Sequence, residues 1–197
     1  MAKLYYQGHG SYRITSDEGK VVYVDPYAGD GYDVPADVIL ETHGHFDHNV
    51  LEKPAKKEGC VIITEKEALA GGDYQKFSLC GIDILAVPAY NKNHDPKECV
   101  GYIITVDGVK VYASGDTSKT EYMEKVLPGM KLDYALLPCD GVYNMDAAGA
   151  AECARLIGAK VSIPVHTIPG GLFSREVAEK FDIEERLIIE PGETIDL

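Results

Sequence analysis

The sequence contains no pair of closely spaced cysteines, no secretory leader and no long hydrophobic run. Its five cysteines are odd in number and scattered along the chain, which disfavours a disulfide framework and predicts reduced thiols. The opening residues, MAKLYYQGHG, lack the apolar core of a signal peptide. No apolar run approaches the roughly 18 residues that a membrane-spanning helix needs. We therefore expect a soluble, cytoplasmic protein with no membrane partner.

Positive charge is also scarce. Lysine and arginine number 19 against 32 acidic residues, so the net charge is −13. A general nucleic-acid or anionic-membrane binder needs Lys and Arg for its phosphate contacts, so this balance argues against both. A small anionic substrate remains compatible, because a bound metal can hold its charge locally. The sequence does not fix the oligomeric state.

Nucleotide-binding loops and interdomain linkers are missing as well. The pair Gly170-Gly171 belongs to no Walker or GxGxxG pattern that opens a helix. No low-complexity segment divides the chain, and 45% of its residues are hydrophobic, which is enough for a substantial core. We therefore expect a single domain that spans residues 1–197.

Short runs rich in β-branched residues and tyrosine predict a mainly β protein. The expected strands are residues 20–24, 37–42, 60–64, 82–87, 100–106, 109–113, 133–138, 161–165 and 187–189. Asp107-Gly108 between two of them predicts a tight hairpin turn. Helices are expected at residues 49–57, 118–126, 146–156 and 174–181, and Asp146 and Ser174 are suitable N-caps.

Two segments of the chain resemble each other. Residues 10–25 read GSYRITSDEGKVVYVD, and residues 101–116 read GYIITVDGVKVYASGD. Each ends in an aspartate and is followed by a strand that opens with another. This predicts two related β-rich halves, about 1–95 and 96–197, packed face to face as two mixed sheets with helices outside. The alternative is that the two hairpins share only their composition.

The stretch THGHFDHN, residues 42–49, gathers half of the six histidines in the chain. His43, His45 and His48 stand beside Asp47, directly after a hydrophobic strand. Imidazole and carboxylate groups are ligands of Zn²⁺, Fe, Ni and Mn. Four donors so close together suit two ions about 3.5–4 Å apart better than one. A surface histidine cluster is the alternative, but the position after a strand argues against it.

The run HGHFDH, residues 43–48, resembles the HxHxDH motif of the metallo-β-lactamase superfamily. Asp25 in VYVDP, His94, Asp116 in SGDT and His166 in IPVHT follow the other superfamily motifs in order. The resemblance covers nearly the whole chain and is strongest to the small cytosolic branch near ascorbate-6-phosphate lactonase. It implies an α/β fold, the αββα sandwich, with the site at one edge between two sheets.

The resemblance also implies a ligand set for two metal ions. The first ion would take His43, His45 and His94, the second Asp47, His48 and His166, and Asp116 would bridge both. Asp25 would lie behind the histidine loop and accept an imidazole N–H; its alternative is a turn aspartate before Pro26.

His94 departs from the usual superfamily pattern. The third histidine commonly follows a Pro-x pair directly, whereas here Pro88 and Ala89 are followed by Tyr90, and His94 comes four residues later. We expect His94 to be a ligand. The alternative is a solvated loop histidine, which would favour a site with one metal ion.

Three further residues are candidates near this site. His9 stands between two glycines that let the backbone approach closely, and proton transfer, substrate contact and an extra metal ligand are open roles for it. Tyr143 follows a strand end on the same predicted edge and could contact substrate. Cys139 could ligate a metal but is expected to be a lining or core thiol.

Together these features predict a metal-dependent hydrolase that attacks a small ester, lactone or phosphoester with water activated by one or two divalent ions. Zn²⁺ is the expected metal, with Mn²⁺, Ni²⁺ and Fe²⁺ as alternatives. Asp47 or His9 would move the proton, and Tyr143 would contact substrate. The alternatives are a nuclease or RNA-processing hydrolase of the same fold and a metal-binding protein without catalysis.

Overall fold

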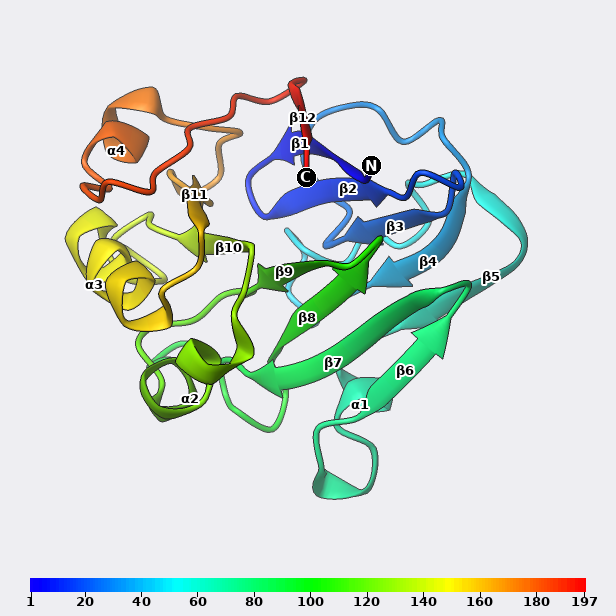
Figure 1. The fold of residues 1–197 in the computed structure, drawn as a ribbon, viewed down its shortest axis with the longest axis horizontal. Coiled ribbons are helices and arrows are strands. Elements are labelled where there is room, and N and C mark those ends of the chain that lie inside the picture. The colour runs from blue at the N-terminus through cyan, green and yellow to red at the C-terminus, as the bar shows by residue number, and fades with distance from the viewer.

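A computed structural model describes all 197 residues. Its framework is two six-stranded sheets that pack face to face (Figure 1). The first sheet has the order β12-β1-β2-β3-β4-β5 and the second β11-β10-β9-β8-β7-β6. Both sheets contain parallel and antiparallel pairs. The strands of the first sheet are β1 (Lys3–Gly8), β2 (Ser11–Thr15), β3 (Val21–Val24), β4 (Ala36–Leu40), β5 (Lys56–Ile63) and β12 (Thr194–Asp196). Those of the second are β6 (Lys76–Leu79), β7 (Ile82–Pro88), β8 (Val100–Val106), β9 (Val109–Ala113), β10 (Tyr134–Pro138) and β11 (Val161–Val165).

The main core lies between the two sheets. It joins Leu4 and Val22 of the first sheet to Ile84 and Tyr102 of the second in one cluster of 25 buried residues. Most of these strands are apolar on both faces, because each sheet also packs on its outer side. The expected fold of two mixed sheets with outer helices is confirmed.

Helices cover mainly the second sheet (Figure 1). α3 (Ala147–Ile157) lies against β10 and β11 with a face of alanines and Ile157, and α2 (Glu121–Lys125) packs beside it. The predicted N-cap Asp146 accepts the Gly149 N–H at 2.8 Å, and Gly158 ends α3 in the left-handed conformation. The short α1 (Glu65–Ala68) joins the sheets, and α4 (Arg175–Glu179) follows β11. None of these helices has the length and hydrophobicity that crossing a membrane requires.

The two sheets repeat one strand arrangement. In the first, β2 and β3 form an antiparallel hairpin, and β3, β4 and β5 then run parallel. In the second, β8 and β9 form the hairpin, and β9, β10 and β11 run parallel. The two similar sequence segments are these two hairpins. The two halves are therefore alike in these hairpins and also in the parallel strands that follow them.

A carboxylate fastens each hairpin to the next strand. Asp37 accepts a backbone N–H of β3 at 2.8 Å and lies 2.6 Å from Lys57 Nζ. Asp133, at the equivalent place, accepts a backbone N–H of β9 at 2.8 Å and lies 2.7 Å from Lys160 Nζ. Burial would raise the pKa of both carboxyls, but the lysine and backbone contacts outweigh it and lower each pKa.

Two expected elements are wrong. Residues 49–57 are not a helix: residues 49–55 form turns and Lys56 begins β5, because the backbone donors are used by a distant loop, with Val50 N–H bonded to Pro26 O and Ala55 N–H to Tyr32 O. Residues 187–189 are not a strand either, since after a single bridge at Arg186 the chain leaves β11. The terminal strand is β12, which pairs with β1 and was not predicted.

Candidate metal centre

The predicted ligands meet at one edge of the sandwich because the strands before them all run the same way. Within the first sheet β1, β3 and β4 run in one direction, and within the second sheet β7, β9, β10 and β11 run in one direction. Contacts between the loops that follow them, such as His48 with Asp116, bring both sets of carboxyl ends to the same edge. The loops after these strands supply His9, Asp25, His43, His45, Asp47, His48, His94, Asp116, Asp140 and His166.

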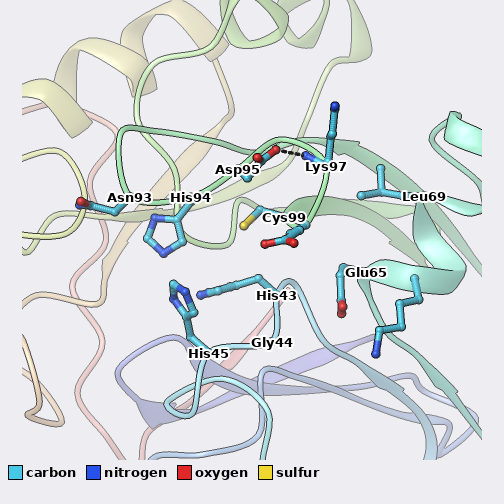
Figure 2. Close-up of a pocket in the computed structure, with 12 residues that line it drawn as sticks. His43, Gly44, His45, Glu65, Leu69, Asn93, His94, Asp95, Lys97 and Cys99 are labelled. Carbon is cyan, nitrogen blue, oxygen red and sulfur yellow. Dashed lines mark hydrogen bonds between the residues drawn. The ribbon is translucent and has the colours of Figure 1, made fainter.

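The first group contains the three histidines that were predicted to hold one ion. The ligand atoms of His43, His45 and His94 lie within 4.8 Å of one another. Figure 2 shows their rings converging from two loops. Burial, followed by the nearby His48, lowers the pKa of His43 to about 2, so His43 is neutral and able to bind a cation.

His94 reaches this group through a tight turn. Asn91 and His94 exchange two backbone hydrogen bonds of 3.2 Å, which turns the chain back on itself after Tyr90. The side chain of His94 is only 2% exposed. The turn thus accommodates the shift of four residues from position 90 to His94, and the solvated-loop alternative does not hold.

The second group adds donors from both sheets. Ligand atoms of His9, Asp47, His48 and His166 also lie within 4.8 Å of one another. The carboxyl oxygens of Asp116 lie 3.5 Å from Nε2 of His48 and 3.5 Å from Nε2 of His166. Asp116 Oδ2 also lies 3.4 Å from Nε2 of His94 in the first group. Asp116 is thus close to both groups, as a bridging ligand would be.

Four buried histidines share one orientation. Each directs Nδ1 at an oxygen atom, and each has an Nε2 atom buried without a hydrogen-bond partner. The Nδ1 contacts are His43 to Thr42 Oγ1 (3.0 Å), His48 to Asp25 Oδ2 (2.9 Å), His94 to Asn91 Oδ1 (2.8 Å) and His166 to Asp140 Oδ2 (3.1 Å). A buried nitrogen lone pair without a partner is costly. Histidines held through Nδ1 with Nε2 free are oriented as metal ligands are, so these residues fit divalent cations.

Electrostatics keeps the carboxylates charged. Burial would raise the pKa of Asp116, but the imidazoles of His48 and His166 outweigh it and lower that pKa to about 2. Burial would likewise lower the pKa of His48, yet Asp116 and Asp25 outweigh it and raise that pKa to about 9. In the absence of metal, a proton on His48 therefore compensates part of the negative charge.

Asp25 has the position that was expected of it. It is buried, accepts the Thr42 N–H and hydroxyl at 2.7 Å each, and holds His48 Nδ1. Asp140 lies against Nδ1 of His166 in the same way, a contact that was not predicted from the sequence. Its signal in the sequence was an aspartate at the end of a hydrophobic strand, YALLPCD, as Asp25 ends VVYVD. Cys139 is buried, contacts Val165 O and belongs to neither group of ligands.

A cavity of about 480 Å³ opens onto both groups of ligands. His45, Asp47, His94 and Asp116 line it together with Tyr143, whose phenol is at the rim and which is 51% exposed. An adjoining cavity of about 530 Å³, drawn in Figure 2, shares His45, Asn93 and His94 but does not reach Asp116. The 480 Å³ cavity is therefore the one in which a substrate would contact both metal positions.

Comparison with known proteins agrees with this geometry. The family model described as the beta-lactamase superfamily domain matches residues 3–166. The chain belongs to the metallo-β-lactamase superfamily. It is 30% identical over 227 aligned positions to a UPF0173 metal-dependent hydrolase of Thermococcus onnurineus, with both chains fully covered. This superfamily member is accordingly a metal-dependent hydrolase.

Solved structures share the fold. A protein of Parabacteroides distasonis described as a metal-dependent hydrolase is 30% identical, has a TM-score of 0.74, and aligns over 95% of this chain and 91% of its own. Igni18, a metallo hydrolase of Ignicoccus hospitalis, is 24% identical with a TM-score of 0.77 over 98% of this chain and 97% of its own. The resemblance predicted from HGHFDH is thus confirmed for the superfamily. The relation to ascorbate-6-phosphate lactonase and the role of each ligand stay predictions.

Proposed function

We propose that this metallo-β-lactamase superfamily hydrolase cleaves a small ester, lactone or phosphoester in the 480 Å³ cavity, with two divalent ions at the two ligand groups. The observation that carries the proposal is the set of four buried Nε2 atoms without partners, all near Asp116. Zn²⁺ suits this histidine-rich set best, and Mn²⁺, Ni²⁺ and Fe²⁺ are the alternatives. When bound, such ions supply Lewis acidity that activates water and polarises the scissile bond.

The residues of the chain bind and orient the reactants. Asp47 lines the cavity with a side chain that is 19% exposed, and the contacts with His9 and His48 outweigh burial and hold its pKa well below the usual range. It is therefore a carboxylate at neutral pH, with an oxygen that can take the proton of the attacking water. Tyr143 at the rim can donate its phenol to a substrate oxygen, because its backbone carbonyl, and not its hydroxyl, makes the contacts to Asn91 and Asn93.

The lining of the cavity favours a compact substrate of low charge. Phe46, which is 75% exposed, Tyr143 and Pro169 form an apolar rim, and no lysine or arginine lines the cavity. The negative charge of a phosphoester would be neutralised by the metal ions alone. An ester or lactone is therefore favoured over a phosphoester as substrate. Together with the net charge of −13, the lining also disfavours a polynucleotide substrate.

Turnover of small ester, lactone and phosphodiester probes tests the proposal. We expect activity only after metal is restored to chelator-treated protein, and a ranking of Zn²⁺, Mn²⁺, Ni²⁺ and Fe²⁺ in the same assay identifies the preferred ion. Asp116→Asn should lower kcat/KM by more than about 100-fold. Asp30→Asn, the same change at an exposed position, serves as control. Full activity of folded Asp116→Asn would contradict the proposal, as would metal-loaded protein that is inert towards all three classes.

A further inference from the structure

His9 is fixed beside the metal centre by its backbone. It is a non-glycine residue with a φ of 53°, in the left-handed region that costs roughly 1–2 kcal/mol. Its N–H donates to Leu172 O at 2.6 Å, and its carbonyl accepts both the Tyr6 hydroxyl at 2.9 Å and the His166 N–H at 2.8 Å. The strained residue is thus tied directly to a predicted ligand. Strain of this kind persists where the surroundings hold a residue in place, typically at functional sites.

The side chain of His9 lies between two hydrogen-bond acceptors. The ring is fully buried, with Nδ1 3.1 Å from Gly171 O and Nε2 3.3 Å from Asp47 Oδ2. A neutral imidazole has one N–H and one lone pair. It can satisfy one of these oxygens, and its lone pair must then face the other. For the neutral ring, that second contact is favourable only if a cation lies between the lone pair and the oxygen; a doubly protonated ring would donate to both oxygens.

The four buried histidines indicate, by analogy, which nitrogen of His9 carries the hydrogen. Each of them directs Nδ1 at an oxygen atom and leaves Nε2 towards the centre. His9 repeats this arrangement, with the Gly171 carbonyl as the Nδ1 acceptor. The Nε2 lone pair then faces Asp47, and the ligand atoms of both residues lie within 4.8 Å of those of His48 and His166.

We infer that His9 is an additional ligand of the second metal ion, bound through Nε2 beside Asp47, His48 and His166. This extends the ligand set taken from the superfamily motifs by one imidazole and rests on the proposed metal centre. The competing role is a hydrogen bond from Nε2–H that only orients Asp47. That role would leave the Nδ1 lone pair 3.1 Å from the Gly171 carbonyl oxygen, with no hydrogen between them.

Replacing His9 by asparagine tests the inference with little disturbance of the backbone, because asparagine tolerates a positive φ better than most residues. Titration of chelator-treated protein with Co²⁺ measures the affinity and number of bound ions. In the His9→Asn variant the second ion should bind about 100-fold more weakly, while the first keeps its affinity. Tyr27→Phe is the matched control, since Tyr27 packs 5.7 Å from the His9 ring and offers neither ion a ligand.

Proton NMR of the Co²⁺-loaded protein separates a ligand from an orienting residue. A histidine bound through Nε2 retains an exchangeable Nδ1–H whose resonance is strongly shifted by the ion. His9→Asn should lack one such resonance, and Tyr27→Phe should keep them all. A complete set in folded His9→Asn with two ions bound would overturn the inference. If the variant does not fold, ¹⁵N spectra of Zn²⁺-loaded wild-type protein decide, since an unchanged His9 Nε2 shift would also overturn it.

The same data distinguish this inference from the proposed function. Wild-type protein that binds two ions with His9 coordinated, yet hydrolyses none of the probes, supports the inference and contradicts the proposed reaction. Wild-type protein that never takes up a second ion contradicts both.

Discussion

The clearest perturbation of the metal centre is the replacement of Asp25 by asparagine. Asp25 is buried, and both of its oxygens accept hydrogens: Oδ1 from the Thr42 N–H at 2.7 Å, and Oδ2 from the Thr42 hydroxyl and from His48 Nδ1–H at 2.9 Å. An amide has only one acceptor oxygen. If that oxygen keeps the Thr42 N–H, the new NH₂ faces His48 Nδ1. His48 must then move its proton to Nε2, the atom that faces the metal.

The size of the effect follows from this change of tautomer. Loss of the group that holds a ligating histidine typically weakens metal binding by about 10–100-fold, or about 1.4–2.8 kcal/mol. The other orientation of the amide directs NH₂ at the Thr42 N–H and leaves two buried donors face to face. That orientation is therefore also unfavourable. Asparagine tolerates the φ of 46° at this position, and backbone strain should contribute little.

Competition with a chromophoric chelator measures the affinity of both ions in Asp25→Asn and in the wild type. Asp37→Asn is the matched control, because Asp37 lies in the same sheet, is largely buried and accepts a backbone N–H, but contacts no histidine. We expect Asp37→Asn to lower stability and to leave metal affinity unchanged. Folded Asp25→Asn that binds both ions as tightly as the wild type would refute the tautomer argument.

Three other predictions address the ligands and the sheets. His94→Ala should lower metal content from about two ions per chain to about one, whereas unchanged content by elemental analysis would show that His94 is not a ligand. Metal binding at pH 7.5 should release protons, because the pKa of His48 is raised to about 9 and that of His166 is also raised. Metal affinity should therefore rise from pH 7 to 9. Calorimetric heats of metal binding that do not depend on the buffer would contradict this proton release. Asp37→Asn and Asp133→Asn should each lower the free energy of unfolding in urea by about 1–2 kcal/mol at pH 7. Because both carboxyl pKa values are lowered on folding, this stabilisation exists above the unfolded pKa and is lost as the pH falls through the folded pKa. If either variant lowered the free energy of unfolding as much at pH 3 as at pH 7, the result would be inconsistent with the ion pairs.

Eight of the twelve strands and the HGHFDH loop could be predicted because their signals are local. A hydrophobic run that ends in a cluster of histidines requires no knowledge of distant residues, and the superfamily motifs placed Asp116 and His166 in the second half. The helix expected at residues 49–57 failed for the opposite reason. Its donors bond to Pro26 O and Tyr32 O, which lie more than 20 residues away. Residues 49–55 therefore turn against that loop, and β5 begins at Lys56.

The oxygens that orient the histidines were harder to predict. Asp25 was found through its motif, but Asp140 lies 26 residues before His166 and reaches its Nδ1 only through tertiary packing. Thr42 and Asn91 lie one and three residues before His43 and His94, but the direction of each side chain depends on the local backbone and is not specified by that spacing. His94 could be proposed as a ligand but not placed with certainty, because its reach depends on the turn closed at Asn91.

The repeated sheets explain why neither half could form this centre alone. Asp25 follows β3, and Asp116 follows the equivalent strand β9 after two additional residues. His48 lies between them, with Nδ1 2.9 Å from Asp25 and Nε2 3.5 Å from Asp116. Each group of ligands likewise combines residues of the first sheet with one from the second, His94 or His166. A bound ion therefore links the two sheets across their edge, and its binding free energy adds to the stability of the sandwich.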